Sequence, residues 1–194
     1  LTSIIETLRN KGMHVLLSSV PVNLRHTAPF LSVHRPDLSM EQLDQWHELG
    51  SKGSQSADEK NWDEAITHLQ AALAIDPDFA DTHFRLATAF ENTGNFQEAK
   101  NHYQRALDLD ALRFRADTRI NQIIQKVAAS VENDAFSFVD SAAAFEQASQ
   151  PFQPGWNLFL EHVHYDFSGN HILAAELSHS IMSSLAAPDD YQPL

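Results

Sequence analysis

The feature that most constrains the fold is a self-similarity of period 34 between Trp46 and Arg113. Small residues recur in the two copies as Gly53 and Ala87, Ala65 and Ala99, and Ala72 and Ala106. Larger apolar residues recur in the same way, as Trp62 and Phe96, and as Leu69 and Tyr103. Small side chains let antiparallel helices approach closely, and larger ones fill the space between successive turns. The spacing therefore predicts two helix hairpins, over residues 46–79 and 80–113.

The period and the residue types resemble the tetratricopeptide repeat (TPR) family. Asp76-Pro77 ends the first copy, Asp110-Ala111 ends the second, and Gly94-Asn95 marks the tight turn inside the second. The resemblance covers about a third of the chain. It implies a module that either packs as a spacer or docks a protein partner.

The inner face of the repeats indicates what such a module can bind. Some TPR domains hold a C-terminal carboxylate with Lys, Arg and Asn on their inner helices. The corresponding face here carries His47, Gly50, Ser51, Ser54, Asp81, Arg85 and Thr88. Arg85 is the one cation in that set, so we do not expect this carboxylate clamp. Two repeats also give a short, shallow groove, and they are fewer than the three or so that are usually needed for independent stability.

The sequences on either side of the repeats follow a different pattern, in which helices alternate with short apolar strands. Helical spacing predicts helices over residues 2–10, 116–129 and 170–185, the last with Ser168 as its N-cap. Apolar runs predict strands over 13–20 and 135–139, the first buried on both faces as in a parallel sheet. A loop is expected between the second strand and the last helix.

This order of elements is typical of an α/β protein interrupted by an all-helical insert. We therefore expect a mainly helical chain of the α+β or α/β class. The expected divisions are an α/β segment, the repeats, a returning α/β segment and a disordered tail, at residues 1–39, 40–113, 114–187 and 188–194.

A second informative stretch is residues 161–170, which read EHVHYDFSGN. Glu161 precedes His164 by three residues. A carboxylate near an imidazole suits a His base that is oriented by an acidic group. The chain contains no equally good candidate for the nucleophile that such a pair would serve.

Three blocks of the chain resemble the SGNH (GDSL-like) hydrolases, a family of esterases and acyl hydrolases with a flavodoxin-like sheet. HVLLSSVPVN is similar to the family's fourth core strand and following loop. INQIIQKVAAS and FSFVD are similar to its last helix and strand, with Asn121 opening the helix and Asp140 ending the strand. EHVHYDFSGNHILAAEL is similar to its closing D-x-x-H block.

This resemblance implies a catalytic role for the pair near the C-terminus. His164 would be the base, and Glu161, in place of the usual Asp, would orient it. The family's Gly-Asp-Ser and oxyanion blocks do not occur in the chain. The resemblance therefore implies the C-terminal part of a Ser-dependent hydrolase, with an ester substrate of unknown identity and a Ser nucleophile supplied upstream. The TPR insert would cover the substrate cleft.

Other roles remain open for several residues. A metal-dependent hydrolase would use imidazole and carboxylate ligands chosen from His162, His164, His171 and Asp166. Cations near the return into the α/β part are expected to pair with carboxylates, with anion binding as the alternative; they are Arg113, Arg115 and Arg119. The remaining function class is a TPR adaptor whose flanks serve only as a scaffold. No cofactor is predicted.

Composition excludes several kinds of partner. The net charge of −13, with only 13 scattered Lys and Arg residues, argues against binding to nucleic acid or an anionic membrane. The absence of Cys removes disulfides, thiolate metal sites and a Cys nucleophile. No apolar run approaches the ~20 residues that a membrane span needs. These features fit a cytoplasmic protein. Because the sequence opens at Leu1 within a predicted helix, we expect a piece of a longer protein.

Overall fold

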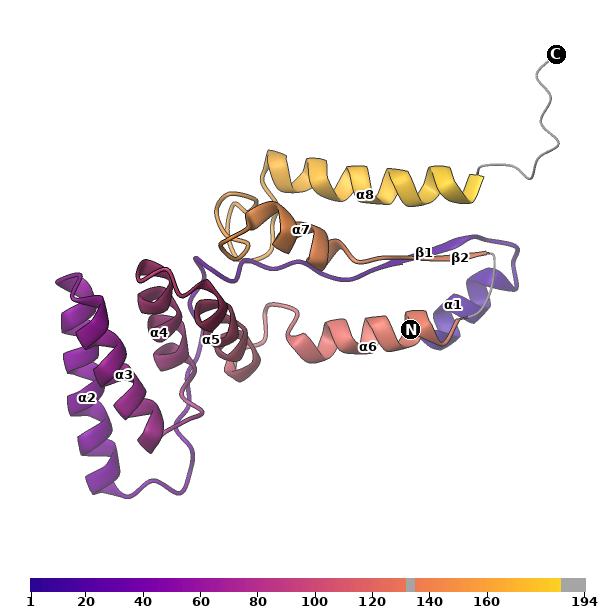
Figure 1. The fold of residues 1–194 in the computed structure, drawn as a ribbon. Helices are drawn as coiled ribbons and strands as arrows, with labels where there is room; N and C mark the ends of the chain where they lie inside the picture. Colours follow the sequence, from indigo (N-terminus) through magenta and orange to yellow (C-terminus); the bar gives the residue numbers. More distant parts are fainter. Residues whose placement is uncertain (132–134, 186–194) are drawn as a thin grey trace, which may run out of the picture.

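The computed structural model describes residues 1–131 and 135–185, so the predicted tail at 188–194 lies outside the described residues. The described chain is mainly helical and contains one small parallel sheet (Figure 1). Its helices are α1 (Thr2–Arg9), α2 (Met40–Asp58), α3 (Trp62–Ile75), α4 (Ala80–Asn92), α5 (Phe96–Leu109), α6 (Thr118–Ala129), α7 (Ser141–Ser149) and α8 (Phe167–Leu185). Its strands are β1 (Val15–Ser18) and β2 (Phe136–Val139).

Helices α2 to α5 form the two predicted hairpins. The first begins with a capping box, because the Ser39 hydroxyl accepts from the Gln42 backbone N–H and the Gln42 side chain accepts from that of Ser39. Helix α2 then packs on α3, α3 on α4, and α4 on α5. All residues from Trp62 to Leu107 are described, and none of them lies in a strand. The prediction of two helix pairs is confirmed.

The repeated small residues lie where the helices approach most closely. The four recurring alanines of α3 and α5 are buried. A Cβ atom added to Gly53 would lie only 2.7 Å from Cγ of Leu69, so α2 and α3 touch at this position. Leu69 and Tyr103, the recurring larger residues, are buried in one apolar core with Leu86. The 34-residue spacing therefore arises from the packing of the helices, as predicted.

The two turns inside the hairpins are equivalent in conformation but not in sequence. Gly94 has a φ of +78°, in the left-handed region that glycine adopts without steric cost. Lys60, which lies 34 residues earlier, has a φ of +63°. The sequence marks the second turn through its glycine. The first turn carries no such mark, because a lysine occupies the strained position.

Strands β1 and β2 pair in parallel, with Val15 opposite Phe136 and Ser18 opposite Val139. Helices α1 and α6 contact β1, and α8 contacts β2, so that helices lie on both faces of the sheet (Figure 1). The expectation that the first strand is buried on both faces is wrong for this chain. Each residue of β1 is only half-buried, because a two-stranded sheet leaves both of its edges unpaired.

Two boundaries after β2 differ from the sequence prediction. The stretch expected to be a loop contains helix α7, which Asp140 caps by accepting from the Ala143 N–H. Helix α8 begins at Phe167, so Ser168 lies inside it rather than at its N-cap. Asp166 provides the cap, since its carboxylate accepts from the Gly169 N–H at 2.8 Å.

The carboxyl ends of both strands point toward the repeats (Figure 1). At this end the Ser19 hydroxyl donates to Asp140, and the hydroxyls of Ser18 and Ser141 lie 2.7 Å apart. The Asn121 side chain bonds both the N–H and the carbonyl of Val20, which fixes α6 to the end of β1. Polar side chains therefore join the two strands, α6 and α7 at one edge.

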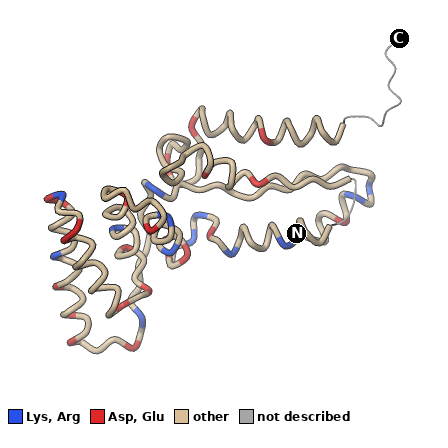
Figure 2. The backbone as a smooth tube through the Cα atoms, viewed as in Figure 1, with Lys and Arg blue, Asp and Glu red and all other residues tan. Residues whose placement is uncertain are grey.

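Charged residues are unevenly distributed along this fold. Figure 2 shows acidic and basic residues along α2 to α5, and long uncharged stretches along the two strands and α8. Within the described ranges, no helix combines the length and apolarity required to cross a membrane.

Candidate functional site

The inner face of the repeats forms a groove between α2 and α4. A cavity of about 470 Å³ lies there, and its walls include six of the seven residues predicted for this face. Those six are His47, Gly50, Ser51, Ser54, Asp81 and Arg85. Thr88, the seventh, borders two smaller hollows farther along α4. The helical periodicity of the sequence thus predicts which residues line the groove.

Trp46 forms an aromatic wall of this groove. Its ring is 8% exposed and packs against His34 and Phe79, with ring centroids 4.6 and 4.5 Å away. Gly50 lies one turn along α2, where a Cβ atom would reach the indole at 3.9 Å. The small residues of α2 leave the groove open above this ring. The Trp46 indole N–H is buried and has no acceptor among the described residues.

The electrostatics of the groove do not suit a carboxylate ligand. Arg85 is its one Lys or Arg residue among those described, and the guanidinium Nε donates to Asp81 at 2.6 Å. Asp58 also borders the groove and has no bonded partner in the described part of the chain. The groove is therefore acidic overall. An anionic partner would have to compete with Asp81 for the single cation.

An extended segment that precedes the repeats binds to the end of each one. We call residues 23–34 the strap. Asp76 ends the first repeat and accepts from Nδ1 of His34 at 2.7 Å. Asp110 ends the second repeat and accepts from the backbone N–H groups of Phe30 and Leu31 at 3.0 and 3.1 Å. Both aspartates are buried.

The strap was not predicted from the sequence, although a signal for it exists. Asp76 and Asp110 are 34 residues apart, and the sequence pattern alone marks them as the ends of the two repeats. Each also accepts from the N–H two residues later, which is a local turn that Asp commonly makes. A buried charge needs more donors than this turn supplies. The recurrence of Asp at both repeat ends is visible in the sequence, but the burial that calls for further donors is a feature of the structure.

Arg115 completes the attachment of the strap to the second repeat. The residue is 4% exposed, and its guanidinium donates to the carbonyls of Asn23 and Thr27 and lies 3.3 Å from Asp110. Arg113 pairs with Asp117. The predicted pairing with carboxylates is confirmed for these two arginines. Burial lowers the pKa of Arg115, while the hydrogen bond and charge of Asp110 oppose that shift.

The second candidate site is the loop that contains Glu161 and His164. The Glu161 Oε1 accepts from Nδ1 of His164 at 2.5 Å and from its backbone N–H at 2.6 Å. Burial raises the pKa of the Glu161 carboxyl, but hydrogen bonds from the backbones of residues 162–164 and from the His164 ring lower it to about 2. The His164 side chain is 79% exposed, so its other ring nitrogen is open to solvent.

Glu161 also contacts a second histidine, which sequence reasoning did not anticipate. Its Oε2 pairs with Nδ1 of His162. The His162 ring in turn packs edge-on against Phe30 of the strap, with centroids 5.1 Å apart. The strap also donates the Asn23 N–H to the His162 carbonyl at 3.1 Å. The loop, the strap and the second repeat are thus in direct contact.

The predicted metal ligands do not come together in the described structure. Within residues 1–131 and 135–185, no group of three or more His, Cys, Asp or Glu side chains has the geometry to hold a metal ion. Asp166 instead caps α8. Asn121 and Asp140, which the hydrolase resemblance singled out, both line a pocket at the carboxyl ends of the strands, but they bond different groups: Asn121 bonds Val20, and Asp140 accepts from Gln125 of α6 at 3.2 Å.

Comparison with known proteins supports the repeat region. Residues 56–117 match the family model of the tetratricopeptide repeat. Over 100 residues the chain is 27% identical to the DnaJ protein P58IPK homolog of Arabidopsis thaliana, which covers 51% of this chain and 21% of that protein. The chain thus spans about a fifth of the length of this curated relative. No solved structure matches it.

The matches and the helix pairs agree: the chain contains a TPR region. They give no support to the SGNH resemblance.

Proposed function

We propose that the chain is a protein-docking module whose TPR groove binds a short segment of a partner protein. The observation that carries this proposal is the cavity of about 470 Å³ between α2 and α4, the first helices of the two repeats. Packing inside the repeats does not use this space. Grooves on helical repeats commonly bind extended or helical peptides.

The groove favours a neutral or basic segment. Asp58 is free of partners among the described residues, and Arg85 is already engaged by Asp81. A Lys or Arg side chain of the partner would pair with Asp58, while an apolar side chain would pack on Trp46. The overall charge of −13 favours the same partners at longer range.

Selection of displayed peptides that bind the 194-residue protein, followed by measurement of their affinities, tests this proposal. Gly50→Leu places a bulky side chain in the groove and improves helix propensity, so the fold is retained while affinity falls about ten-fold or more. Lys52→Leu adds the same side chain on an exposed part of α2 outside the groove and leaves affinity unchanged. Asp58→Lys weakens basic peptides selectively. Peptides that are insensitive to Gly50→Leu would exclude the groove as the docking site.

A second candidate function is hydrolysis, and the geometry of Glu161 and His164 favours it. The carboxylate bonds one ring nitrogen and the other is solvent-exposed, as a general base requires. Under this proposal residues 1–39 and 114–187 belong to an SGNH-type ester hydrolase with a larger flavodoxin-like sheet. The parallel pairing of β1 and β2, with helices on both faces, is consistent with part of such a sheet.

The hydrolase proposal needs a Ser nucleophile from outside these 194 residues. The isolated chain should therefore show no ester hydrolysis above background. In the longest natural polypeptide that contains these residues, His164→Ala should reduce turnover on the order of 10³-fold, and Glu161→Gln somewhat less. His162→Ala is the matched control, since it removes the other imidazole on Glu161. Unchanged turnover in a folded His164→Ala variant would end this assignment.

A further inference from the structure

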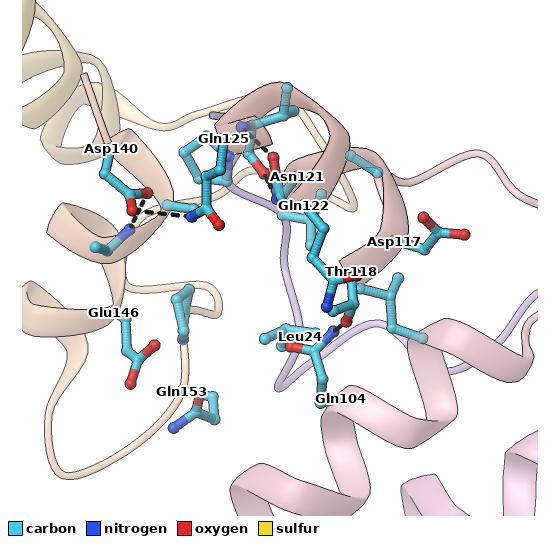
Figure 3. A pocket seen from close by; sticks show the side chains of 18 residues that line it. Leu24, Gln104, Asp117, Thr118, Asn121, Gln122, Gln125, Asp140, Glu146 and Gln153 are labelled. Carbon is cyan, nitrogen blue, oxygen red and sulfur yellow. Dashed lines mark hydrogen bonds between the residues drawn. The ribbon is translucent and has the colours of Figure 1, made fainter. Parts of the chain in front are cut away.

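A pocket separate from the TPR groove lies at the carboxyl ends of the two strands. It has a volume of about 320 Å³ and lies between α5, α6 and α7 and the loop after β1 (Figure 3). In open α/β sheets, ligands bind outside the carboxyl ends of the strands. The volume is at the lower end of the ~300–1,000 Å³ typical of small-molecule sites.

The polar side chains of this pocket are mainly amides. Five Gln or Asn residues line it: Gln104, Asn121, Gln122, Gln125 and Gln153. Three of them are bonded within the protein: Gln104 donates to Thr118, Asn121 holds Val20, and Gln125 donates to Asp140. The side-chain amides of Gln122 and Gln153 make no hydrogen bond with any described residue. Figure 3 shows Gln153 next to Glu146, across the open space from Gln122.

Gln153 is the group that points most directly to a ligand. The residue is 6% exposed, yet its amide lines the pocket without a protein partner among the described residues. The Gln153 amide is open to the cavity and is not among the fully buried, unpartnered polar atoms, so water or a ligand in the pocket must supply its hydrogen bonds. A bound molecule with both donors and acceptors would satisfy it.

The charges around the pocket restrict the class of that molecule. The described lining includes Asp117, Asp140 and Glu146 but no Lys, Arg or His, which disfavours anions. Each carboxylate already has a donor, because Arg113 pairs with Asp117, Ser19 with Asp140, and Lys100 with Glu146. Asp117 and Glu146 are thus paired with cations, and Asp140 is hydrogen-bonded by neutral donors, so all three carboxylates have partners without a ligand.

We propose that this pocket binds a small neutral molecule rich in hydroxyl groups, of the size of a single sugar ring. Hydroxyl groups both donate and accept, as do the free amides of Gln153 and Gln122. The apolar side chains of Val22, Leu24 and Leu107 line the same pocket and would contact the C–H surface of the ring. This inference does not depend on the docking function of the TPR groove.

Titration of the 194-residue protein with glucose and N-acetylglucosamine, followed by amide NMR shifts, tests the proposal. Gluconate serves as the anionic comparator, and a doubly blocked glycine amide represents a peptide ligand. We expect saturable shifts at pocket residues with at least one neutral sugar and weaker binding of gluconate. Absence of saturable binding by either sugar would overturn the proposal. So would binding of the blocked amide alone.

Two variants locate the binding. Gln153→Met retains side-chain length but removes the amide, and it should weaken sugar binding about ten-fold or more. Gln147→Met is the matched control, because Gln147 is exposed on α7 and does not line the pocket. Gln122→Ala, at an exposed position, weakens binding without a risk to the core and so covers the case in which Gln153→Met fails to fold. Sugar affinity that is unchanged in Gln122→Ala and in folded Gln153→Met would also overturn the proposal.

Discussion

The repeats and the α/β part of this chain use apolar residues in opposite ways. In α2 to α5, the recurring alanines, Leu69 and Tyr103 are buried in a dense core. In the α/β part, each residue of β1 is half-buried, and Phe167 of α8 is 91% exposed. The first region satisfies its own packing, whereas the second leaves apolar surface open to a partner or to further chain.

The difference arises because the packing contacts of a helix hairpin join residues close in the sequence, whereas those of a parallel strand pair join residues far apart. A helix hairpin pairs residues within one 34-residue unit, and neighbouring units bury the face between them. A parallel strand pair needs a crossover and at least one further element on each face. Here Val15 pairs with Phe136, on the far side of the entire repeat region. The repeats are thus stabilised locally, and the sheet is stabilised only by long-range contacts.

The largest loss of stability is expected where the strap and Arg115 join the second repeat to the α/β part, at Asp110. Asp110→Ala leaves the buried guanidinium of Arg115 without its carboxylate and removes the acceptor for two strap N–H groups. We expect a loss of about 3–5 kcal/mol in the free energy of unfolding, measured by urea titration. Asp78→Ala removes an exposed partner of Arg105 and should cost about 1 kcal/mol or less. Equal losses in the two variants would show that the junction adds nothing.

Truncation of an apolar side chain in each region tests the contrast directly. Leu69→Ala opens a cavity in the repeat core and should cost about 2–5 kcal/mol. Phe167→Ala removes a larger but exposed side chain and should change stability by about 0.5 kcal/mol or less. Both are measured by urea titration with fluorescence detection. A large loss in Phe167→Ala would mean that a second molecule covers α8 in solution.

Acidification should weaken the repeats through two histidines that contact each other. Nδ1 of His83 lies 2.8 Å from Nδ1 of His102, and Nε2 of His83 donates to the Pro77 carbonyl. Burial, and then the charge of His83, lower the pKa of His102 to about 4, and burial lowers that of His83. The unfolded chain binds protons more readily than the folded one, so stability falls as the pH drops from about 6.5 to about 4.

After allowance for solvent screening, this loss amounts to about 1–2 kcal/mol. His102→Gln keeps a donor near His83 but removes one titrating group, so it should flatten the pH dependence of the urea midpoint. His68→Gln, on the partly exposed face of α3, is the control and should retain it. If His102→Gln has the same pH profile as the original protein, the pair does not control acid stability.

The smallest expected effect is a gain at the first hairpin turn. Lys60 adopts the left-handed conformation that Gly94 adopts in the second repeat. Lys60→Gly should relieve this strain and stabilise the repeats by about 0.5–1 kcal/mol. Gly94→Ala, the reciprocal change, should destabilise them by a similar amount. Differential scanning calorimetry would detect both shifts, and a lower melting temperature for Lys60→Gly would contradict the argument.

The fold is predictable from the sequence where side-chain packing is periodic. The spacing of Gly53, Ala87 and their equivalents predicted all four repeat helices, and the inner-face residues line the observed groove. The apolar runs predicted both strands and a parallel sheet, but not the pairing of the two strands with each other or their exposure. Helix α7 was missed because its short run of small residues lacks a clear apolar stripe, and its cap Asp140 was interpreted only as the end of a strand.

The contacts of the sites were harder to predict because they depend on distant segments. The spacing of Glu161 and His164 suggested their hydrogen bond, which the structure contains. The second partner of Glu161, His162, is held by Phe30 of the strap, and nothing in the local sequence indicates that contact. The catalytic role of the pair stays a prediction. The amide pocket combines residues from both sides of the repeat region, so no single motif marks it.

The strap limits how this repeat array can evolve. Most helical repeats gain or lose units by duplication, because each unit contacts only its neighbours. Here the strap binds the end of the first repeat through His34 and the end of the second through Phe30 and Leu31, three or four residues away. A third unit inserted between them would carry the two anchor points apart without lengthening the strap. The number of repeats is therefore set by a segment that lies outside the repeats.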